Sequence, residues 1–236
     1  MAIWAIVPAA GQGKRMGASV PKQHLPINGK TVLQYSLERL ARVRALAGLV
    51  LVLHPDDGTP MSADLPDTLP VLIARGGNER CHSVLNALNI LESKSASDDW
   101  ILVHDAARPC LRAAEVDGLL EAVCNHDVGG LLAAPVSDTL KKVNDKGEVV
   151  GTVSRSLLHK ALTPQVFRFN ILRRALKLAA KQNTIMTDES AAVESLGLSP
   201  LVVRGSTDNI KITHTSDLFL AELIIKRQIS LGLEKP

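Results

Sequence analysis

Short aliphatic runs recur along this chain of 236 residues, and longer segments with helical spacing lie between them. This alternation constrains the fold more than any other feature, because it is expected of a largely parallel sheet covered by helices. Runs of Val, Ile, Leu and Ala suit strands that are buried on both faces. The fold class is therefore predicted to be α/β. The predicted strands cover residues 3–7, 49–53, 71–74, 100–103, 130–134 and 201–203.

Helix signals lie between these runs. Thr31 and Gln34 have the spacing of a capping box, and Leu33, Leu37 and Leu40 follow as an i, i+4, i+7 stripe. The sequence therefore predicts amphipathic helices that cover the sheet. Similar stripes are Val84, Leu88 and Leu91, then Leu172, Leu176 and Ala179, and finally the segment 218–233.

Composition predicts one globular domain, 1–236, in which apolar residues make up 46% and charged residues 22%. No apolar run approaches the roughly 20 residues that cross a membrane. The net charge of +3 and the scarcity of aromatic residues, 3%, argue against a nucleic-acid partner. Cys81, Cys110 and Cys124 have no CxxC spacing, and no basic leader precedes the first run. A cytoplasmic protein without a disulfide scaffold or structural zinc is expected.

One segment, 138–152, departs from this rhythm because two short alternating runs flank the turn-forming residues 144–147. It predicts a β-hairpin that projects from the sheet. The pattern is equally compatible with an interface arm and with a surface hairpin that has no partner.

The strongest chemical signal is the loop 8–17, which follows the first run and contains Gly11, Gly13, Lys14 and Arg15. Small residues let the backbone approach an anion closely, and exposed N–H groups can cradle phosphate oxygens. The spacing matches neither a Rossmann GxGxxG motif nor a P-loop. A glycine-rich turn with two solvated cations is the alternative. Lys22 adds a cation a few residues further on.

Asp105 lies just past the run 100–103, and ligands of open parallel sheets bind at that edge. It could cap a helix, or it could supply the single carboxylate that Mg²⁺ needs beside a triphosphate. The segment 76–83 also joins a run to a helix, and its glycines and polar residues could bind a base or ribose. Its alternative is an ordinary turn with Asn78 as the helix N-cap.

Seven motifs, in order along the chain, resemble the 2-C-methyl-D-erythritol 4-phosphate cytidylyltransferase family. The resemblance implies a Rossmann-like nucleotidyltransferase fold with a mainly parallel twisted sheet, helices on both faces and a projecting hairpin arm, 136–155. The motifs are Pro8-Ala9-Ala10-Gly11-x-Gly13-x-Arg15-Met16, Pro21-Lys22-Gln23, Gly76-Gly77-x-Glu79-Arg80-x-x-Ser83, Val103-His104-Asp105-Ala106-Ala107-Arg108-Pro109, Leu162-Thr163-Pro164-Gln165, Thr187-Asp188-Glu189 and Asp208-Asn209-Ile210-Lys211.

The resemblance also implies the reaction: CTP and methylerythritol phosphate give CDP-methylerythritol and pyrophosphate, with Mg²⁺ held in part by Asp105. The expected catalytic residues are Arg15, Lys22, Arg155 and Lys211. The expected CTP-binding residues are Ala9, Ala10, Gly11, Gly13, Arg15, Lys22, Gly77, Asn78, Arg80, Ser83, Asp105 and Ala106. The expected acceptor-binding residues are Asp105, Arg108, Thr139, Arg155, Thr163, Thr187 and Lys211.

In this family the arm hooks a second subunit, so a homodimer is expected in which Arg155 and Thr139 serve the partner's site. The chain departs from the family pattern at Asn78, where Asp is common, and at His24, where an aromatic residue is common. Two alternatives remain open. One is cytidylyl transfer to another polyol phosphate such as ribitol 5-phosphate, and the other is a regulatory protein that binds nucleotide without catalysis.

Overall fold

A seven-stranded sheet forms the centre of the molecule in the computed structural model, which describes residues 1–11, 20–55, 66 and 68–235. The strand order is β11-β7-β10-β6-β1-β4-β5. Neighbouring strands pair in parallel except β10, which is antiparallel to both β6 and β7. The α/β prediction is confirmed. The strands are β1 (Ile3–Pro8), β4 (Gly48–Leu53), β5 (Val71–Arg75), β6 (Trp100–Val103), β7 (Gly129–Pro135), β10 (His159–Arg168) and β11 (Leu201–Arg204).

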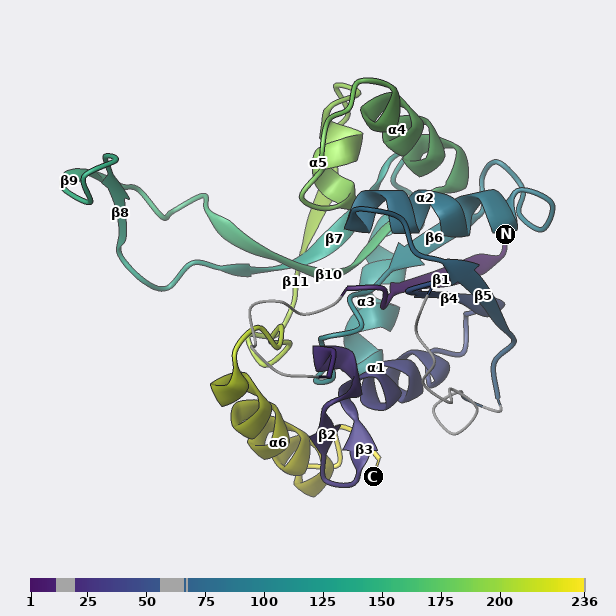
Figure 1. Ribbon diagram of the computed structural model, residues 1–236, viewed down its shortest axis with the longest axis horizontal. Coiled ribbons are helices and arrows are strands. Elements are labelled where there is room, and N and C mark those ends of the chain that lie inside the picture. Colours follow the sequence, from purple (N-terminus) through teal and green to yellow (C-terminus); the bar gives the residue numbers. More distant parts are fainter. Residues whose placement is uncertain (12–19, 56–65, 67, 236) are drawn as a thin grey trace.

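Helices cover both faces of this sheet (Figure 1). One apolar core lies between the sheet and the helices α1 and α3, and a second lies between the sheet and α2, α4 and α5. The predicted cap is present, since the Thr31 hydroxyl accepts a hydrogen bond from the Gln34 N–H at 3.0 Å. The helices are α1 (Val32–Ala41), α2 (Arg80–Leu91), α3 (Ala113–Val123), α4 (Phe169–Lys181), α5 (Glu189–Glu194) and α6 (Thr215–Ser230).

The carboxyl-terminal helix α6 packs away from the sheet, against α1 and the short pair β2 (Pro26–Ile27) and β3 (Lys30–Thr31). Two ion pairs hold the segment after α6 against α1. The Oε2 of Glu234 lies 2.7 Å from the Nη1 of Arg39 and 2.8 Å from the Nη1 of Arg42. This packing anchors the segment that leads into α6, which contributes to the site described below.

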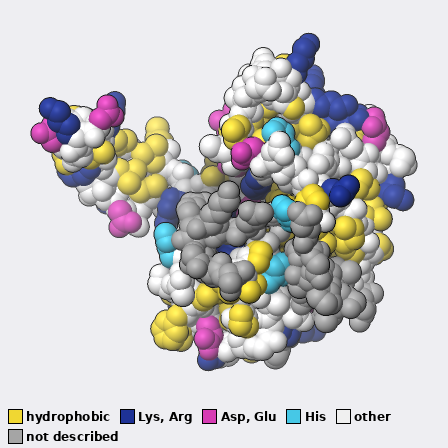
Figure 2. All heavy atoms as spheres, in the orientation of Figure 1, with side chains coloured by type: hydrophobic (Ala, Val, Ile, Leu, Met, Phe, Trp, Pro, Cys, Tyr) yellow, Lys and Arg dark blue, Asp and Glu magenta, His cyan; other side chains and the backbone are white. Residues whose placement is uncertain are grey.

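The predicted hairpin is confirmed as β8 (Leu140–Val143) paired antiparallel with β9 (Val149–Val153). It extends far from the sheet on the chain that leaves β7 and returns to β10 (Figure 1). Apolar side chains gather on its surface (Figure 2), and Val143, Val149 and Val150 are each more than half exposed. We call residues 136–155 the arm.

Candidate active site

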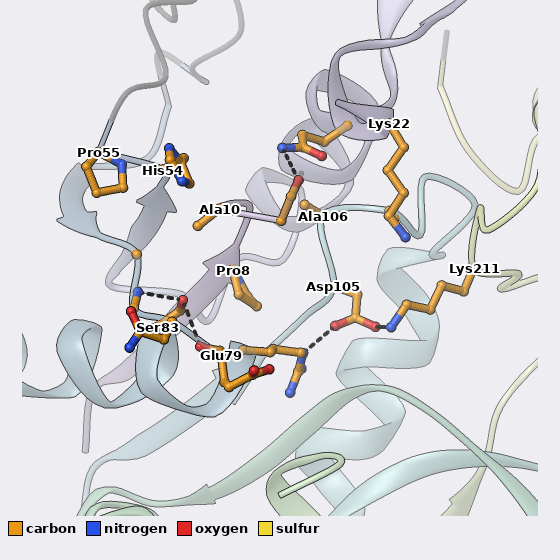
Figure 3. Close-up of a pocket in the computed structure, with 17 residues that line it drawn as sticks. Pro8, Ala10, Lys22, His54, Pro55, Glu79, Ser83, Asp105, Ala106 and Lys211 are labelled. Atoms are coloured by element: carbon orange, nitrogen blue, oxygen red, sulfur yellow. Dashed lines mark hydrogen bonds and ion pairs between the residues drawn. The ribbon is translucent and has the colours of Figure 1, made fainter. Parts of the chain in front are cut away.

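A cavity of about 520 Å³ opens where β1, β4, β5 and β6 end (Figure 3). Its position at the carboxyl edge of a parallel sheet is where ligands of such folds bind. It brings together many of the residues predicted from the sequence, which come from segments far apart in the chain. The residues that line it are Pro8, Ala10, Gly11, Lys22, Gln23, His54, Pro55, Gly76, Gly77, Asn78, Glu79, Arg80, Ser83, Asp105, Ala106, Ala107 and Lys211.

The start of the glycine loop is held by Gln23, which the sequence-based site did not include. Its buried side-chain amide donates to the carbonyl oxygen of Ala9 at 2.6 Å and to that of Gly11 at 3.1 Å. The loop also approaches Gly76 closely, since a Cβ there would lie 2.4 Å from the Cβ of Ala10. Gly76 therefore lets two walls of the cavity meet. The predicted residues Gly13 and Arg15 lie outside the described residues.

The loop before α2 is held by its own helix. The Ser83 hydroxyl accepts from the Gly77 N–H at 3.0 Å and donates to the Glu79 carbonyl oxygen at 3.2 Å. Glu79, and not Asn78, occupies the N-cap position, so the alternative of Asn78 as the cap is wrong. Asn78 instead lines the cavity, together with Gly77 and Ser83.

Asp105 lies at the centre of a cluster of cations at the floor of the cavity. Its Oδ1 is 2.9 Å from the Arg80 Nε, and its Oδ2 is 2.8 Å from the Lys211 Nζ and 3.7 Å from the Arg108 Nε. Arg80 in turn binds Glu189, with its two terminal nitrogens 2.7 and 2.9 Å from the two carboxylate oxygens. Asp105 therefore works as a shared counter-ion rather than as a helix cap.

The charges of this cluster reinforce one another. Burial by itself raises the pKa of Asp105, but Arg80, Lys211 and Arg108 overcome it and hold that pKa well below its usual range. Burial opposes the charge of Arg80 too, yet Glu189 and Asp105 raise the pKa of its guanidinium. The three cations Arg80, Arg108 and Lys211 outnumber the carboxylates of Asp105 and Glu189, so the floor of the cavity suits an anionic ligand.

Lys22 approaches the same point from the other wall. It belongs to the 3-10 helix η2 (Lys22–His24), and its Nζ donates to the carbonyl oxygen of Ile212 at 2.9 Å. Figure 3 shows its side chain extending toward the paired Asp105 and Lys211. Because Ile212 directly follows Lys211, this hydrogen bond places two of the four predicted catalytic cations side by side.

Behind Asp105 lies a buried polar network. The Thr163 hydroxyl accepts from the Asp105 N–H at 3.1 Å. The Arg108 carbonyl oxygen can only accept, so the His104 Nε2 carries the ring proton and donates to it at 3.2 Å. The Nδ1 of the neutral ring therefore accepts from the Thr163 hydroxyl at 2.9 Å. Asn209 completes the network by donating to the Thr163 carbonyl oxygen at 2.7 Å.

This network predicts a pH-dependent stability. Burial lowers the pKa of His104 from 6.5 to about 4, although Asp105 opposes the shift. Below pH 6.5 the unfolded chain binds a proton at His104 that the folded chain does not, so the free energy of unfolding falls as pH falls. The loss by pH 4 is on the order of 3 kcal/mol.

Urea unfolding of the wild type and of His104→Gln between pH 7 and pH 4.5 checks this prediction. The variant is expected to have the shallower dependence on pH, while His159→Gln, which changes an exposed histidine, keeps the wild-type slope. Equal slopes for the wild type and His104→Gln would contradict it.

The remaining predicted residues do not line the cavity. Ala9, Arg108 and Thr163 are buried just behind it, and the Thr163 hydroxyl is used within the polar network. Thr187 is exposed directly before α5, two residues from Glu189. Thr139 and Arg155 lie on the arm, where Arg155 donates to the carbonyl oxygen of Ser137.

Sequence reasoning missed three residues that organise the site, namely Gln23, Glu189 and Gln165. All three fall within the motifs quoted for the resemblance, yet none received a role. Their place inside these motifs is the signal that could have found them, and the structure buries all three, so their polar groups need partners. The partners of Gln23 lie 12 and 14 positions away and that of Glu189 lies 109 positions away, so only the fold shows the pairing.

A mainly parallel sheet with a glycine-bordered cationic cavity at its carboxyl edge is typical of a protein that binds a nucleotide, and the family comparison places the chain among the nucleotidyltransferases. Comparison with known proteins gives the family. The family model "2-C-methyl-D-erythritol 4-phosphate cytidylyltransferase" matches residues 3–227, and the chain belongs to this family.

Proteins that are similar in sequence or in structure carry the same family name. The chain is similar to the proteins of this name from Hahella chejuensis, 48% identical over 95% of this chain and 93% of that one, and from Pseudomonas savastanoi, 49% identical over 98% and 97%. It also resembles the crystal structure of the Francisella tularensis protein, with a TM-score of 0.81 and 33% identity over 95% of this chain and all of that one, 100%. The Rossmann-like nucleotidyltransferase fold predicted from the sequence is confirmed.

Proposed function

We propose that this protein transfers a cytidylyl group from CTP to 2-C-methyl-D-erythritol 4-phosphate, with release of pyrophosphate, in the synthesis of isoprenoid precursors. The observation that carries the proposal is the placement of Lys22, Arg80, Lys211 and Asp105 in one cavity, beside the two glycine loops. Membership of the family supports the choice of nucleotide and acceptor. The cytoplasm is the proposed location.

The reaction needs no covalent nucleophile from the protein. An oxygen of the acceptor phosphate attacks the α-phosphorus of CTP, the bond to the β-phosphate oxygen breaks, and pyrophosphate leaves with the electron pair. Negative charge grows on the α-phosphate and on the leaving group, so the protein contributes by positioning and by fixed positive charge. Lys22 and Lys211 fit this role because each reaches the cavity and is held by a partner, Ile212 and Asp105 respectively.

The nucleotide is expected to bind along the two loops. The backbone at Ala10 and Gly11 offers the phosphate cradle, and the wall formed by Gly77, Asn78 and Ser83 faces the base and ribose. Arg15, from the same loop, is expected to add charge at the triphosphate. The acceptor would then occupy the open side near Lys211 and Thr187, with Arg108 and Thr163 supporting the floor from behind.

Mg²⁺ fits a site at Asp105, the one carboxylate of the cluster whose pKa is held low. The described part of the chain holds no group of three or more His, Cys, Asp or Glu side chains that would bind a metal by themselves. A single carboxylate matches the way Mg²⁺ binds with substrate phosphates and water. When bound, the ion would neutralise charge on the phosphates. Arg80 and Lys211 keep Asp105 ionised, which is the form that would bind the ion.

A turnover assay tests the proposal. Release of pyrophosphate would be followed with CTP and either methylerythritol phosphate or ribitol 5-phosphate, and with UTP in place of CTP. We expect CTP with methylerythritol phosphate to give the highest kcat/KM. Preference for ribitol phosphate would overturn the choice of acceptor, and binding of CTP without turnover of either acceptor would favour a non-catalytic regulator.

We further propose that the arm joins two copies of the chain into a homodimer. The exposed valines of β8 and β9 form an apolar surface on a projecting hairpin, which a partner would cover. Thr139 and Arg155 lie on this arm and not at the cavity of their own chain, so a dimer would let each arm serve the partner's site.

Subunit complementation checks the shared site. Lys22→Ala disables the cavity of its own subunit, whereas Arg155→Ala disables only the arm. A purified heterodimer of the two variants would keep one competent site, formed by an intact cavity and the other subunit's intact arm, and is expected to regain about half of wild-type activity. Each variant alone stays inactive. No recovery in verified heterodimers would contradict sharing.

A further inference from the structure

Glu189 does not line the cavity, yet it ends the ionic chain that runs from Lys211 through Asp105 and Arg80. We propose that Glu189 is a positioning residue that holds Arg80, so that Arg80 presents only its Nε to Asp105 and leaves the second Asp105 oxygen to Lys211. The proposal rests on the proposed function, because the reacting phosphates would bind beside this chain.

The first support is the division of Arg80's hydrogen-bond donors. Both terminal nitrogens of its guanidinium bind Glu189, at 2.7 and 2.9 Å, and its Nε binds the Oδ1 of Asp105 at 2.9 Å. A guanidinium usually binds a carboxylate through two parallel hydrogen bonds. Glu189 already makes that two-fold contact here, so Arg80 contributes a single bond to Asp105.

The second support is the position of Lys211 on the carboxylate of Asp105. Its Nζ lies 2.8 Å from the Oδ2 of Asp105, the oxygen that Arg80 does not bind. If the terminal nitrogens of Arg80 were released, the same fork could cover both oxygens of Asp105 and compete with Lys211. Glu189 thereby decides how Asp105 is shared between Arg80 and Lys211 and where the Lys211 ammonium lies.

The third support is that Glu189 is itself fixed by the fold. Its side chain is fully buried, with 0% of the residue exposed. The helix that carries it, α5, is capped by Asp188, whose Oδ1 accepts from the Ala191 N–H at 2.9 Å. Gln165 on β10 ties that end to the sheet, donating to the Oδ2 of Asp188 at 2.9 Å and accepting from the Ser190 N–H at 2.8 Å. The fold therefore fixes the position of the Glu189 carboxylate, and the Arg80 side chain adopts the position that pairs with it.

The charges also require this pair. Glu189 is fully buried whereas about a quarter of the Arg80 side chain, 26%, is exposed, so the buried carboxylate without its cation would be strongly unfavourable. Arg80 begins α2 directly after the loop that lines the nucleotide wall, whereas α5 follows Thr187 on the proposed acceptor side. The pair thus links two walls of the cavity that are 109 positions apart in the chain.

A double-mutant cycle tests the proposal on the full-length protein, with Glu189→Gln, Arg80→Met and the double variant. Glu189→Gln is expected to lower kcat by about ten- to a hundredfold, with a smaller change in the dissociation constant for CTP measured by calorimetry. In the Arg80→Met background the same change is expected to cause no further loss of kcat, because there is no guanidinium left to position. Glu194→Gln, on the exposed end of the same helix, is the matched control and keeps wild-type kinetics.

Thermal stability supplies a second readout that does not depend on turnover. Arg80→Met leaves Glu189 buried without its cation, so the double variant is expected to melt at a higher temperature than Arg80→Met. Independent, multiplicative losses of kcat, or a double variant that melts lower than Arg80→Met, would overturn the positioning role. A wild type that turns over neither acceptor would instead overturn the proposed function, while the melting temperatures would still test the pair.

Discussion

Lys22→Met is expected to lower kcat by about a hundred- to a thousandfold while changing the dissociation constant for CTP by much less. The Lys22 side chain extends toward the paired Asp105 and Lys211 (Figure 3), and its ammonium is held by the carbonyl oxygen of Ile212. A charge aimed at phosphates that become more negative during reaction stabilises the transition state more than the bound substrate. Methionine keeps the length and the apolar stem but removes the charge.

Steady-state kinetics and calorimetric titration with CTP, run on the same preparation, separate the two effects. Lys30→Met is a matched control. Lys30 lies on β3, pairs with Glu38 of α1 at 2.9 Å and does not line the cavity. The control should keep wild-type kcat. A loss of CTP binding as large as the loss of kcat would mean that Lys22 binds substrate and transition state equally, contrary to the role given to it.

The parallel part of the sheet could be predicted because its strands are short, aliphatic and bounded by turn residues. All six predicted strands are present, and no end differs from the prediction by more than one residue. The strand β10 was missed. Its buried half contains Pro164 and Gln165, and Pro164 has no N–H for the ladder, so the register shifts between Ala161 and Gln165 and the pattern does not read as a strand.

Two of the helices were missed for different reasons. The helix α3 carries a regular stripe of Val116, Leu119 and Val123, all fully buried, so its signal was present in the sequence and was not used. The helix α5 has only six residues, too few to show a period. It forms because Asp188 caps it and its apolar residues pack against α4 and the sheet.

Some features of the site could likewise be predicted from the sequence, and others could not. Residues that follow strand ends, such as Ala10, Gly77 and Asp105, could be placed at one edge of the sheet from the sequence, because the carboxyl ends of parallel strands lie together. The partners of buried charges could not be placed. That Glu189 binds Arg80, or that Gln23 binds the loop at Gly11, depends on how helices and loops pack over the sheet.

Asp105→Asn is expected to abolish most activity and to destabilise the fold at neutral pH. The change leaves Arg80, Arg108 and Lys211 around a neutral amide, and breaking a buried ion cluster of this kind costs about 3–5 kcal/mol. The amide N–H₂ would also face a cation. Both Arg80 and Lys211 would lose the partner that positions them, so we expect kcat/KM to fall by more than about a hundredfold.

The pH dependence has a definite sign. The pKa of Asp105 in the folded protein is held below its ordinary value of 3.8, so its ionised form stabilises the fold above that pH and this contribution is lost as pH falls through the lower, folded value. The difference in unfolding free energy between the wild type and Asp105→Asn is therefore largest at neutral pH and shrinks below pH 3.8.

Asp99 and Asp105 lie at opposite ends of β6, so Asp99 is a control that separates an effect on stability from an effect on activity. Asp99 precedes β6 and accepts hydrogen bonds from the Ala2 and Ala96 N–H groups at 2.7 and 2.8 Å, far from the cavity edge. Asp99→Asn should lower the melting temperature and keep kcat, whereas Asp105→Asn should lower both. If the two variants lost activity only in proportion to their stability, Asp105 would be a structural counter-ion, and the cations around it would owe their positions to the fold rather than to its charge.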